Sequence, residues 1–93
     1  MILLLVTFRL HAPWCRSLKD KRALVRPLLH QLRTRFNLAC AEAGLQDVHT
    51  QAELAVVQLA FSAAQAESMQ QTLYDFVSGT CQAELTDWQV EYR

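Results

Sequence analysis

The most chemically distinctive part of the sequence is a run of basic side chains between residues 16 and 36. This stretch holds seven of the nine Lys and Arg residues of the chain and a single acid, Asp20. Cationic side chains in a row on one element can contact several phosphates of a nucleic-acid strand. Arginine suits such contacts better than lysine, because its planar fork binds two phosphate oxygens at once. The stretch is therefore the first candidate binding site.

The basic residues fall along one edge of the helix that this stretch is expected to form. With Val25 at 0° and about 100° per residue, the apolar stripe spans about 300° to 40°. Lys21 and its two basic neighbours lie in the first turn, where the helix dipole disfavours cations by roughly 0.3–1 kcal/mol each. An anion docked there would meet free N–H groups as well as side chains. The candidate nucleic-acid or anion-binding residues are Lys19, Lys21, Arg22, Arg26, His30 and Arg33. The alternative is a solvated basic surface, partly neutralised by Glu67 or Asp75.

Charge is divided unevenly between the two parts of the chain, although the net charge is zero. Residues 1–36 carry eight basic residues and one acid, and residues 37–93 carry one basic residue and eight acids. The two parts therefore carry charges of +7 and −7. This division suggests either a polyanionic partner for the basic part or electrostatic association between copies of the chain.

Length and cysteine content indicate one domain in a reducing compartment. The 93 residues are 52% hydrophobic, which suits a single packed core over residues 1–93. Cys15, Cys40 and Cys81 form no C-x-x-C pair, so neither a disulfide framework nor a zinc knuckle is indicated. The opening "MILLLVTFRL" has no basic n-region and is far shorter than the ~20 apolar residues of a membrane span. We expect a cytoplasmic protein without membrane association or cofactor.

The patterns along the chain predict alternating strands and helices. Strands are expected over residues 2–10, 37–44, 52–61 and 84–93. Ser17, with Asp20, and Ser62, with Gln65, are predicted helix N-caps, and Gly79 is the predicted C-cap of the second helix. Pro27 falls opposite the apolar stripe, where it should bend the helix without breaking it. The order β-α-β-β-α-β indicates an α+β, ferredoxin-like sandwich, with a four-stranded antiparallel sheet and both helices on one face.

A second group of polar residues could hold a metal ion. Asp47 and His49 lie in the turn between the middle strands, and a hairpin centred between Asp47 and Val48 would place Glu42 opposite Glu53. Two facing carboxylates repel unless a proton, a cation or an arginine lies between them. We favour the simpler interpretation that one carboxylate pairs with Arg33 or Arg35 or points to solvent, and we predict no metal site.

Two patterns hint at phosphate chemistry and are weak. Cys15 and Arg22 resemble the C-x5-R loop of phosphatases, but their spacing is one residue too long. Acylphosphatases share the element order and bind phosphate through an arginine of the first loop, where Arg16 stands, but their glycine-rich cradle is missing here. An acylphosphatase-like enzyme is therefore a minor alternative, and we predict no catalytic residues.

The expected open face of the sheet is apolar at one end. Leu3 and Leu5, with Ala55 and Val57, should form a patch of the kind that marks protein interfaces. The face lacks the paired aromatic residues of an RNA-recognition motif. Trp14 is expected either to cover the core or to contact a partner, so the predicted interface residues are Leu3, Leu5 and Trp14. A homodimer formed through the sheet is one expectation.

The segments "SLKDKR", "RFN", "AE" and "AEL" resemble the YlxP-like family of small bacterial proteins, a domain of unknown function. The resemblance runs from the first strand to the last, and it implies a ferredoxin-like fold. The genes of that family tend to lie near translation and ribosome-maturation genes, which implies possible contact with RNA or a ribosomal particle. The matching positions are Lys19, Lys21, Arg22, Arg33, Arg35, Phe36, Asn37, Glu42, Asp47, Glu53 and Leu54. Our leading hypothesis is a non-catalytic RNA-binding protein; a protein-interaction module is the alternative.

Overall fold

Six elements follow one another in the computed structural model, which describes all 93 residues. The predicted order is confirmed, with boundaries that differ by one or two residues. The elements are β1 (Ile2–His11), α1 (Leu18–Arg35), β2 (Ala39–Gly44), β3 (Gln51–Ala60), α2 (Ala63–Thr80) and β4 (Glu84–Tyr92).

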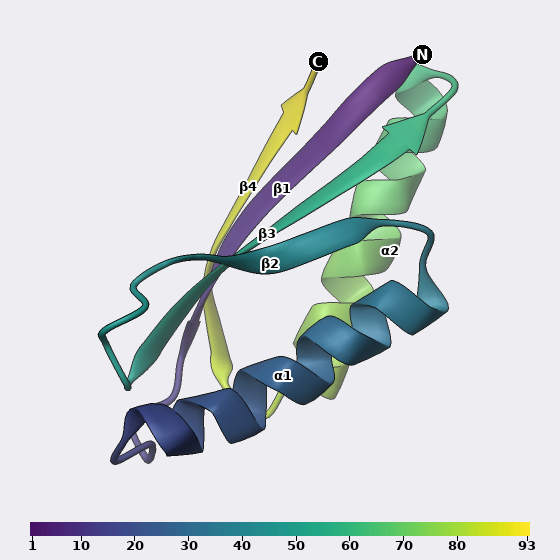
Figure 1. Ribbon diagram of the computed structural model, residues 1–93. Helices are drawn as coiled ribbons and strands as arrows, with labels where there is room; N and C mark the ends of the chain where they lie inside the picture. The colour runs from purple at the N-terminus through teal and green to yellow at the C-terminus, as the bar shows by residue number, and fades with distance from the viewer.

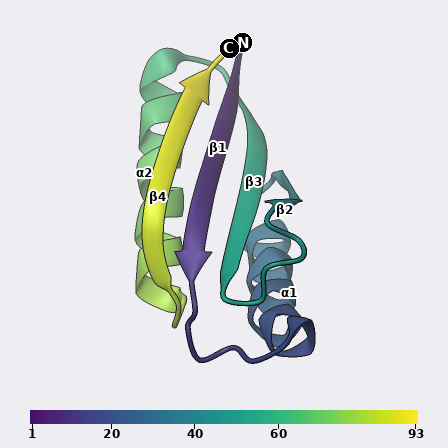
Figure 2. The ribbon, with the colours of Figure 1, turned by 90° about the vertical axis from the view of Figure 1, so that its left-hand side faces the viewer.

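The four strands form one antiparallel sheet in the order β2-β3-β1-β4. Both helices cover the same face of this sheet, and Figure 2 looks onto the opposite face, which no helix covers (Figures 1 and 2). The two chain termini lie together at one end of the sheet, and α1 lies at the other end beside β2. This arrangement confirms the ferredoxin-like α+β fold.

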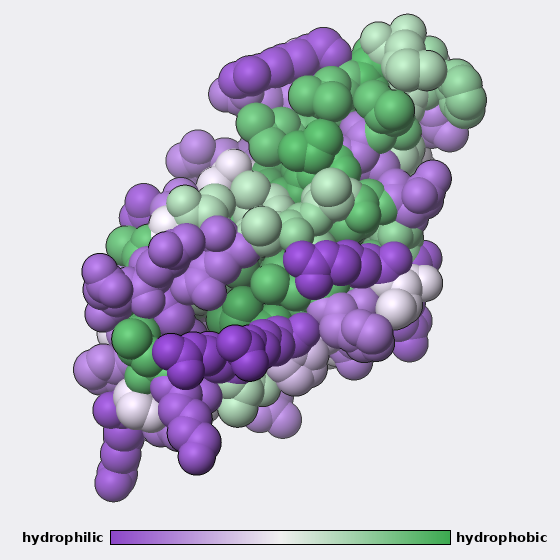
Figure 3. Space-filling model, viewed as in Figure 1, coloured by the Kyte–Doolittle hydropathy of each residue, from purple (hydrophilic) through white to green (hydrophobic).

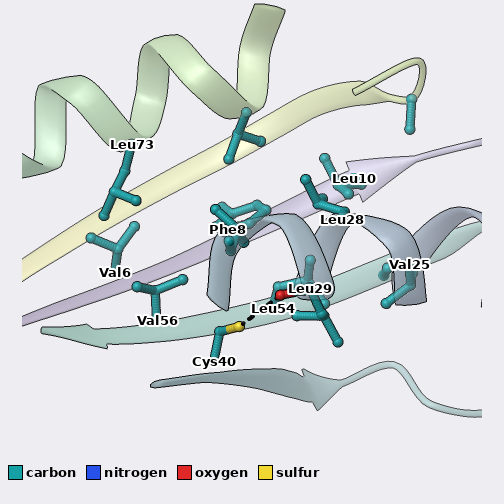
Figure 4. Packing of buried hydrophobic residues seen from close by; sticks show 14 of the residues in the cluster. Val6, Phe8, Leu10, Val25, Leu28, Leu29, Cys40, Leu54, Val56 and Leu73 are labelled. Atoms are coloured by element: carbon teal, nitrogen blue, oxygen red, sulfur yellow. Dashed lines mark hydrogen bonds between the residues drawn. The ribbon is translucent and has the colours of Figure 1, made fainter. Parts of the chain in front are cut away.

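The core lies between the sheet and the helices and begins with the alternation of β1. Leu4, Val6, Phe8 and Leu10 are at most 1% exposed. Figure 4 shows Val6, Phe8 and Leu10 within the cluster between the sheet and the helices. Their counterparts on the other central strand and on the helices complete the cluster: Val25, Leu28, Leu32, Leu54, Val56, Leu73 and Val77. Because β1 is a central strand, its alternate residues lie in the middle of this core, which accounts for the apolar residues at every second position from Leu4 to Leu10.

The helix starts are as predicted, and one predicted helix end is wrong. The Ser17 and Ser62 hydroxyls accept hydrogen bonds from the N–H groups of Asp20 and Gln65, at 3.1 and 3.2 Å. Helix α2 runs through Gly79 to Thr80, because no residue there takes the left-handed conformation that a glycine cap provides. Helix α1 continues through Pro27 without a break, as predicted. No helix is long and apolar enough to cross a membrane.

The hairpin between β2 and β3 departs from the expected register. A bulge at Ala43 sets Glu42 opposite Leu54 and Gly44 opposite Glu53, so the predicted pairing of Glu42 with Glu53 is wrong. An extra residue in one strand turns the following side chain to the other face of the sheet. The two carboxylates therefore lie on opposite faces, one toward the helices and one on the open face.

Candidate anion-binding surface

Three cations of α1 form an exposed row around a shallow hollow. Lys19, Arg22 and Arg26 are exposed, and together with Ala23 and Pro27 they line a hollow of about 490 Å³. Their spacing of three and four residues places them on one side of the helix. The small side chain of Ala23 and the short ring of Pro27 leave the space between the longer basic chains open. Figure 3 shows hydrophilic side chains reaching outward over α1.

This exposed basic row has no acidic partner. The salt bridges of the structure involve Arg9, His11, Lys21 and Arg93, and none includes a member of the row. The acids of the neighbouring helix are used elsewhere. Glu67 accepts hydrogen bonds from Tyr92 and Gln70, and Asp75 accepts one from Gln71. Neutralisation of the row by these acids, the alternative considered above, is absent from the structure.

The N-terminus of α1 is closed by its own side chains. Besides the Ser17 cap, the carboxylate of Asp20 accepts the backbone N–H of Arg16 at 2.9 Å. An anion at this helix end would meet that carboxylate. The available positive surface therefore runs along the side of α1, where Lys19, Arg22 and Arg26 lie, and does not cover the free N–H groups at the helix end.

Lys21 does not belong to this surface, although it stands between two of the row's residues in the sequence. Its residue exposure is 3%, and its ammonium lies 2.9 Å from Glu42 Oε1. It also donates to the backbone carbonyls of Leu45 at 2.8 Å and Gln51 at 3.2 Å. The prediction that Lys21 contacts an external anion does not fit this position, because its charge is already satisfied inside the protein.

Lys21 instead fastens the start of α1 to the β2–β3 hairpin. Leu45 has a positive φ of 57°, a left-handed conformation that costs a non-glycine residue of the order of 1–2 kcal/mol. Its carbonyl accepts both the Lys21 ammonium and the N–H of Val48, at 3.0 Å, which holds that turn in place. The angular position of Lys21, about 320° on the same scale, already lies inside the apolar stripe. That angle is the sequence signal for its burial.

The remaining basic residues of α1 have mixed surroundings. Arg33 donates to the carbonyl of Cys40 at 2.7 Å, which ties the end of α1 to β2. Arg35 lies over the ring of Phe76, 5.2 Å from its centroid. His30 is exposed. The six candidate residues are thus divided: Lys19, Arg22 and Arg26 share one hollow, His30 lies free on the helix surface, and Lys21 and Arg33 hold the fold together.

The second candidate cluster is dispersed by the fold. Glu42 pairs with Lys21, Glu53 lies 4.0 Å from Arg9 on the open face, and Asp47 and His49 are exposed in the hairpin turn. No group of three or more His, Cys, Asp or Glu side chains is arranged to hold a metal ion. The carboxylates pair with cations other than the expected Arg33 and Arg35.

The cysteines are all free, and burial governs their chemistry. Cys15 and Cys40 are buried, and Cys81 is partly buried. Burial raises the pKa of the Cys40 thiol, with a smaller opposing effect from the Arg33 charge, and burial also raises the pKa of Cys81. A thiol with a raised pKa is a poor nucleophile. Cys15 is 3% exposed, unlike the exposed nucleophile of a phosphatase loop, whereas Trp14 beside it is 53% exposed.

A second groove, whose lining has no Lys, Arg, Asp or Glu, adjoins the basic hollow. It has a volume of about 260 Å³ and runs between α1 and the end of α2. Ala23 and Pro27 line both the groove and the hollow, so the two are continuous. No pattern in the sequence indicates this groove, because it joins residues about 50 positions apart. Its lining is Ala23, Leu24, Pro27, Leu28, Gln31, Thr80, Cys81 and Gln82.

Comparison with known proteins places the chain in a family. The chain is 28% identical over 76 residues to the uncharacterized protein YlxP of Bacillus subtilis (strain 168), a match that covers 82% of this chain and 83% of the relative. The model of the family described as "Protein of unknown function (DUF503)" matches residues 3–90, which include both helices, β2 and β3 in full and most of β1 and β4. The chain therefore belongs to this family of proteins of unknown function, DUF503.

Proposed function

We propose that the protein is a non-catalytic cytoplasmic RNA-binding protein that contacts phosphates through the exposed basic row of α1. The observation that carries the proposal is the row itself: Lys19, Arg22 and Arg26 surround one hollow and have no carboxylate within 4.0 Å. Three unpaired cations close together repel one another, and an anionic ligand relieves that repulsion. Three free thiols suit the reducing cytoplasm.

The neighbouring groove favours RNA over a simple polyanion. A nucleotide has a charged phosphate and a flat, weakly polar base, and the hollow and the groove offer one surface for each. Gln31 and Gln82 in the groove carry amides that can hydrogen-bond to base edges, beside the apolar side chain of Leu24. Single-stranded regions, whose bases are free to enter such a groove, are the usual targets of sequence-tolerant RNA recognition. Loops of structured RNA, including those of a ribosomal particle, fit this description.

The proposal is tested by measuring RNA affinity across a salt series. If about three phosphates are contacted, the slope of log K against log salt should be about −2 for single-stranded RNA. The double variant Arg22→Glu/Arg26→Glu should weaken binding by at least tenfold at low salt, because it both removes two contacts and adds repulsion. Fluorescence anisotropy with a labelled stem-loop RNA and with the single strand of its loop gives both quantities.

A matched control separates this surface from general charge effects. Arg93→Glu makes the same charge change as Arg22→Glu but at the far end of the sheet, where Arg93 already pairs with Glu91 at 2.6 Å. We expect Arg22→Glu to lower affinity several-fold and Arg93→Glu to leave it nearly unchanged. Equal effects of the two single variants, or wild-type affinity in the double variant, would refute the proposal.

A further inference from the structure

We propose that the open face of the sheet binds a second copy of this chain, forming a symmetric dimer with the α1 helices on its two outer sides. The contact surface is an apolar patch on three neighbouring strands of the face that no helix covers (Figure 2). We define the apolar patch as Leu3, Leu5, Ala39, Ala41, Ala55, Val57 and Leu59.

The register shows that these side chains form one continuous surface. Val57 of β3 lies opposite Leu5 of β1 on one side and opposite Ala39 of β2 on the other. Directly opposed residues in a sheet are close enough for their side chains to touch, and they point to the same face. In Figure 3, hydrophobic side chains gather above β2 and toward the end of the molecule where the termini lie.

The apolar patch has a relief that suits a copy of itself. Leu59 is 60% exposed and stands at one end. Toward β2, the small residues leave a hollow of about 210 Å³ whose lining is entirely apolar: Ala39, Cys40, Ala41, Ala55 and Val57. In a two-fold interface the same surface is used by both copies, so a raised part must face a sunken part. The patch meets this requirement, because the exposed Leu59 stands beside the hollow lined by the alanines.

The charges around the apolar patch favour a second copy over a charged partner. The patch contains no ionisable side chain, and the nearest rim charges are already paired, Arg93 with Glu91 and Arg9 with Glu53. An acidic partner would find no unpaired cation on this face, because the free cations lie on α1. The open face carries one carboxylate without a cationic partner, Asp87, which lies outside the apolar patch, opposite Arg9 on β4. A copy of the same face meets these internally neutralised rim pairs, so burial of the apolar patch leaves no charge unpaired.

The open face has the size of a small protein interface. Four strands spaced about 4.8 Å apart and about nine residues long at about 3.3 Å each give a face of roughly 19 by 30 Å, or about 570 Å² in projection. Standard interfaces bury about 800 Å² of accessible surface per partner and small ones less than about 600 Å², with an apolar centre and a polar rim. The open face has this layout, with the apolar patch surrounded by Thr7, Gln89 and the rim ion pairs.

The test uses a double substitution that removes the apolar character and keeps the net charge. Leu5 and Val57 are direct neighbours in the register, so Leu5→Glu/Val57→Lys can form a cross-strand ion pair on the exposed face. By sedimentation equilibrium between about 10 and 500 µM, the wild-type chain should have twice its mass of 10.6 kDa. The double variant should have the mass of one chain.

The control places the same two charges elsewhere. Ser68→Glu/Thr72→Lys puts them four residues apart on the exposed side of α2, and this variant should remain a dimer. Circular dichroism must show wild-type secondary structure in both variants; if Leu5→Glu/Val57→Lys fails that check, Ala41→Glu on the edge strand replaces it. A wild-type chain that is monomeric at 500 µM, or a folded patch variant that is still dimeric, overturns the proposal.

Discussion

Lys19 and Lys21 stand two residues apart on the same helix, yet their side chains meet opposite environments. Lys19 is exposed at the edge of the basic hollow, with no carboxylate oxygen within 4.0 Å of its ammonium. Lys21 is 3% exposed and contacts one carboxylate and the carbonyls of the β2–β3 hairpin. The difference shows that a cluster of charges in a sequence has to be resolved by helical angle before any part of it is assigned to binding.

The same comparison shows how the two kinds of cation act on stability. A buried ion pair adds little to the free energy of unfolding compared with two apolar residues in the same place. Removing only one partner is costly, because the other charge is then buried without compensation. Glu42 Oε1 is buried and makes no other hydrogen bond, so it depends on Lys21. An exposed lysine such as Lys19 has no such dependent neighbour. Its removal should affect ligand binding and leave folding nearly unchanged.

The largest expected effect is therefore the loss of Lys21. Lys21→Met should lower the free energy of unfolding by about 3 to 5 kcal/mol, because it strands the Glu42 carboxylate and frees the carbonyl of Leu45. Lys19→Met should change the unfolding free energy by less than about 0.5 kcal/mol. Urea denaturation followed by circular dichroism measures both values.

For RNA affinity, the effects of the two substitutions should be reversed: Lys19→Met should have the larger effect and Lys21→Met the smaller. Lys19→Met should reduce the magnitude of the salt slope by about 0.7 to 0.9, the effect of one lost phosphate contact, whereas folded Lys21→Met should keep the wild-type slope. If the two variants lose the same stability, or if Lys21→Met has the smaller salt slope, the distinction between the two lysines is wrong.

Arg33 gives an intermediate case, because it is exposed and also bonded to the protein. Arg33→Met removes the hydrogen bond to the carbonyl of Cys40 and should cost about 1 kcal/mol of unfolding free energy. Since the Arg33 charge lowers the pKa of the Cys40 thiol, the variant should also raise that pKa further. Arg22→Met serves as the control and should cost less than about 0.5 kcal/mol.

The measurements are denaturant unfolding and ultraviolet titration of the Cys40 thiol in a chain with Ser at positions 15 and 81. An unchanged thiol titration in Arg33→Met would mean that the guanidinium does not act on Cys40. Equal losses of stability in Arg33→Met and Arg22→Met would mean that the hydrogen bond from Arg33 to Cys40 does not stabilise the fold.

Much of the fold can be predicted from local patterns in the sequence. The alternation from Leu4 to Leu10 and the serine caps of both helices fix the strands and the helix starts, because periodicity and capping act over a few residues. The end of α2 was harder to predict. Glycine often ends a helix, but α2 continues through Gly79 to Thr80. Here the favourable packing of Val77 under the sheet outweighs the modest cost of one helical glycine.

The site was only partly predictable, for a different physical reason. The position of the exposed basic row follows from helical angle alone. The pairing of Lys21 with Glu42 depends on the register of β2 and on the bulge at Ala43, which no local sequence pattern indicates. One extra residue reverses the face to which the following side chains point, so an error of one position exchanges the roles of Glu42 and Glu53. Contacts between distant elements, such as the groove beside Cys81, require the assembled fold.

The smallest expected effect on stability comes from a charged hydrogen bond on the surface. It is the exposed counterpart of the buried Lys21–Glu42 pair. The Tyr92 hydroxyl donates to the Glu67 carboxylate, and both residues are exposed. This bond, helped by one from Gln70, lowers the pKa of Glu67 from 4.5, and the same bond raises the pKa of Tyr92 from 10.0. Tyr92→Phe should bring the Glu67 pKa back toward 4.5, which carbon-detected NMR of the carboxylate can follow.

The sign of the pH dependence separates this bond from simple packing of the tyrosine ring. Because the native pKa of Glu67 is lowered, its contribution to stability is present above about pH 4.5 and is lost as the pH falls through the native value. Because the native pKa of Tyr92 is raised, its contribution is present below about pH 10 and is lost as the pH rises through the native value. The stability difference between wild type and Tyr92→Phe should therefore be greatest near neutral pH and shrink toward both extremes. A difference that stays constant from pH 3 to pH 11 would assign it to ring packing.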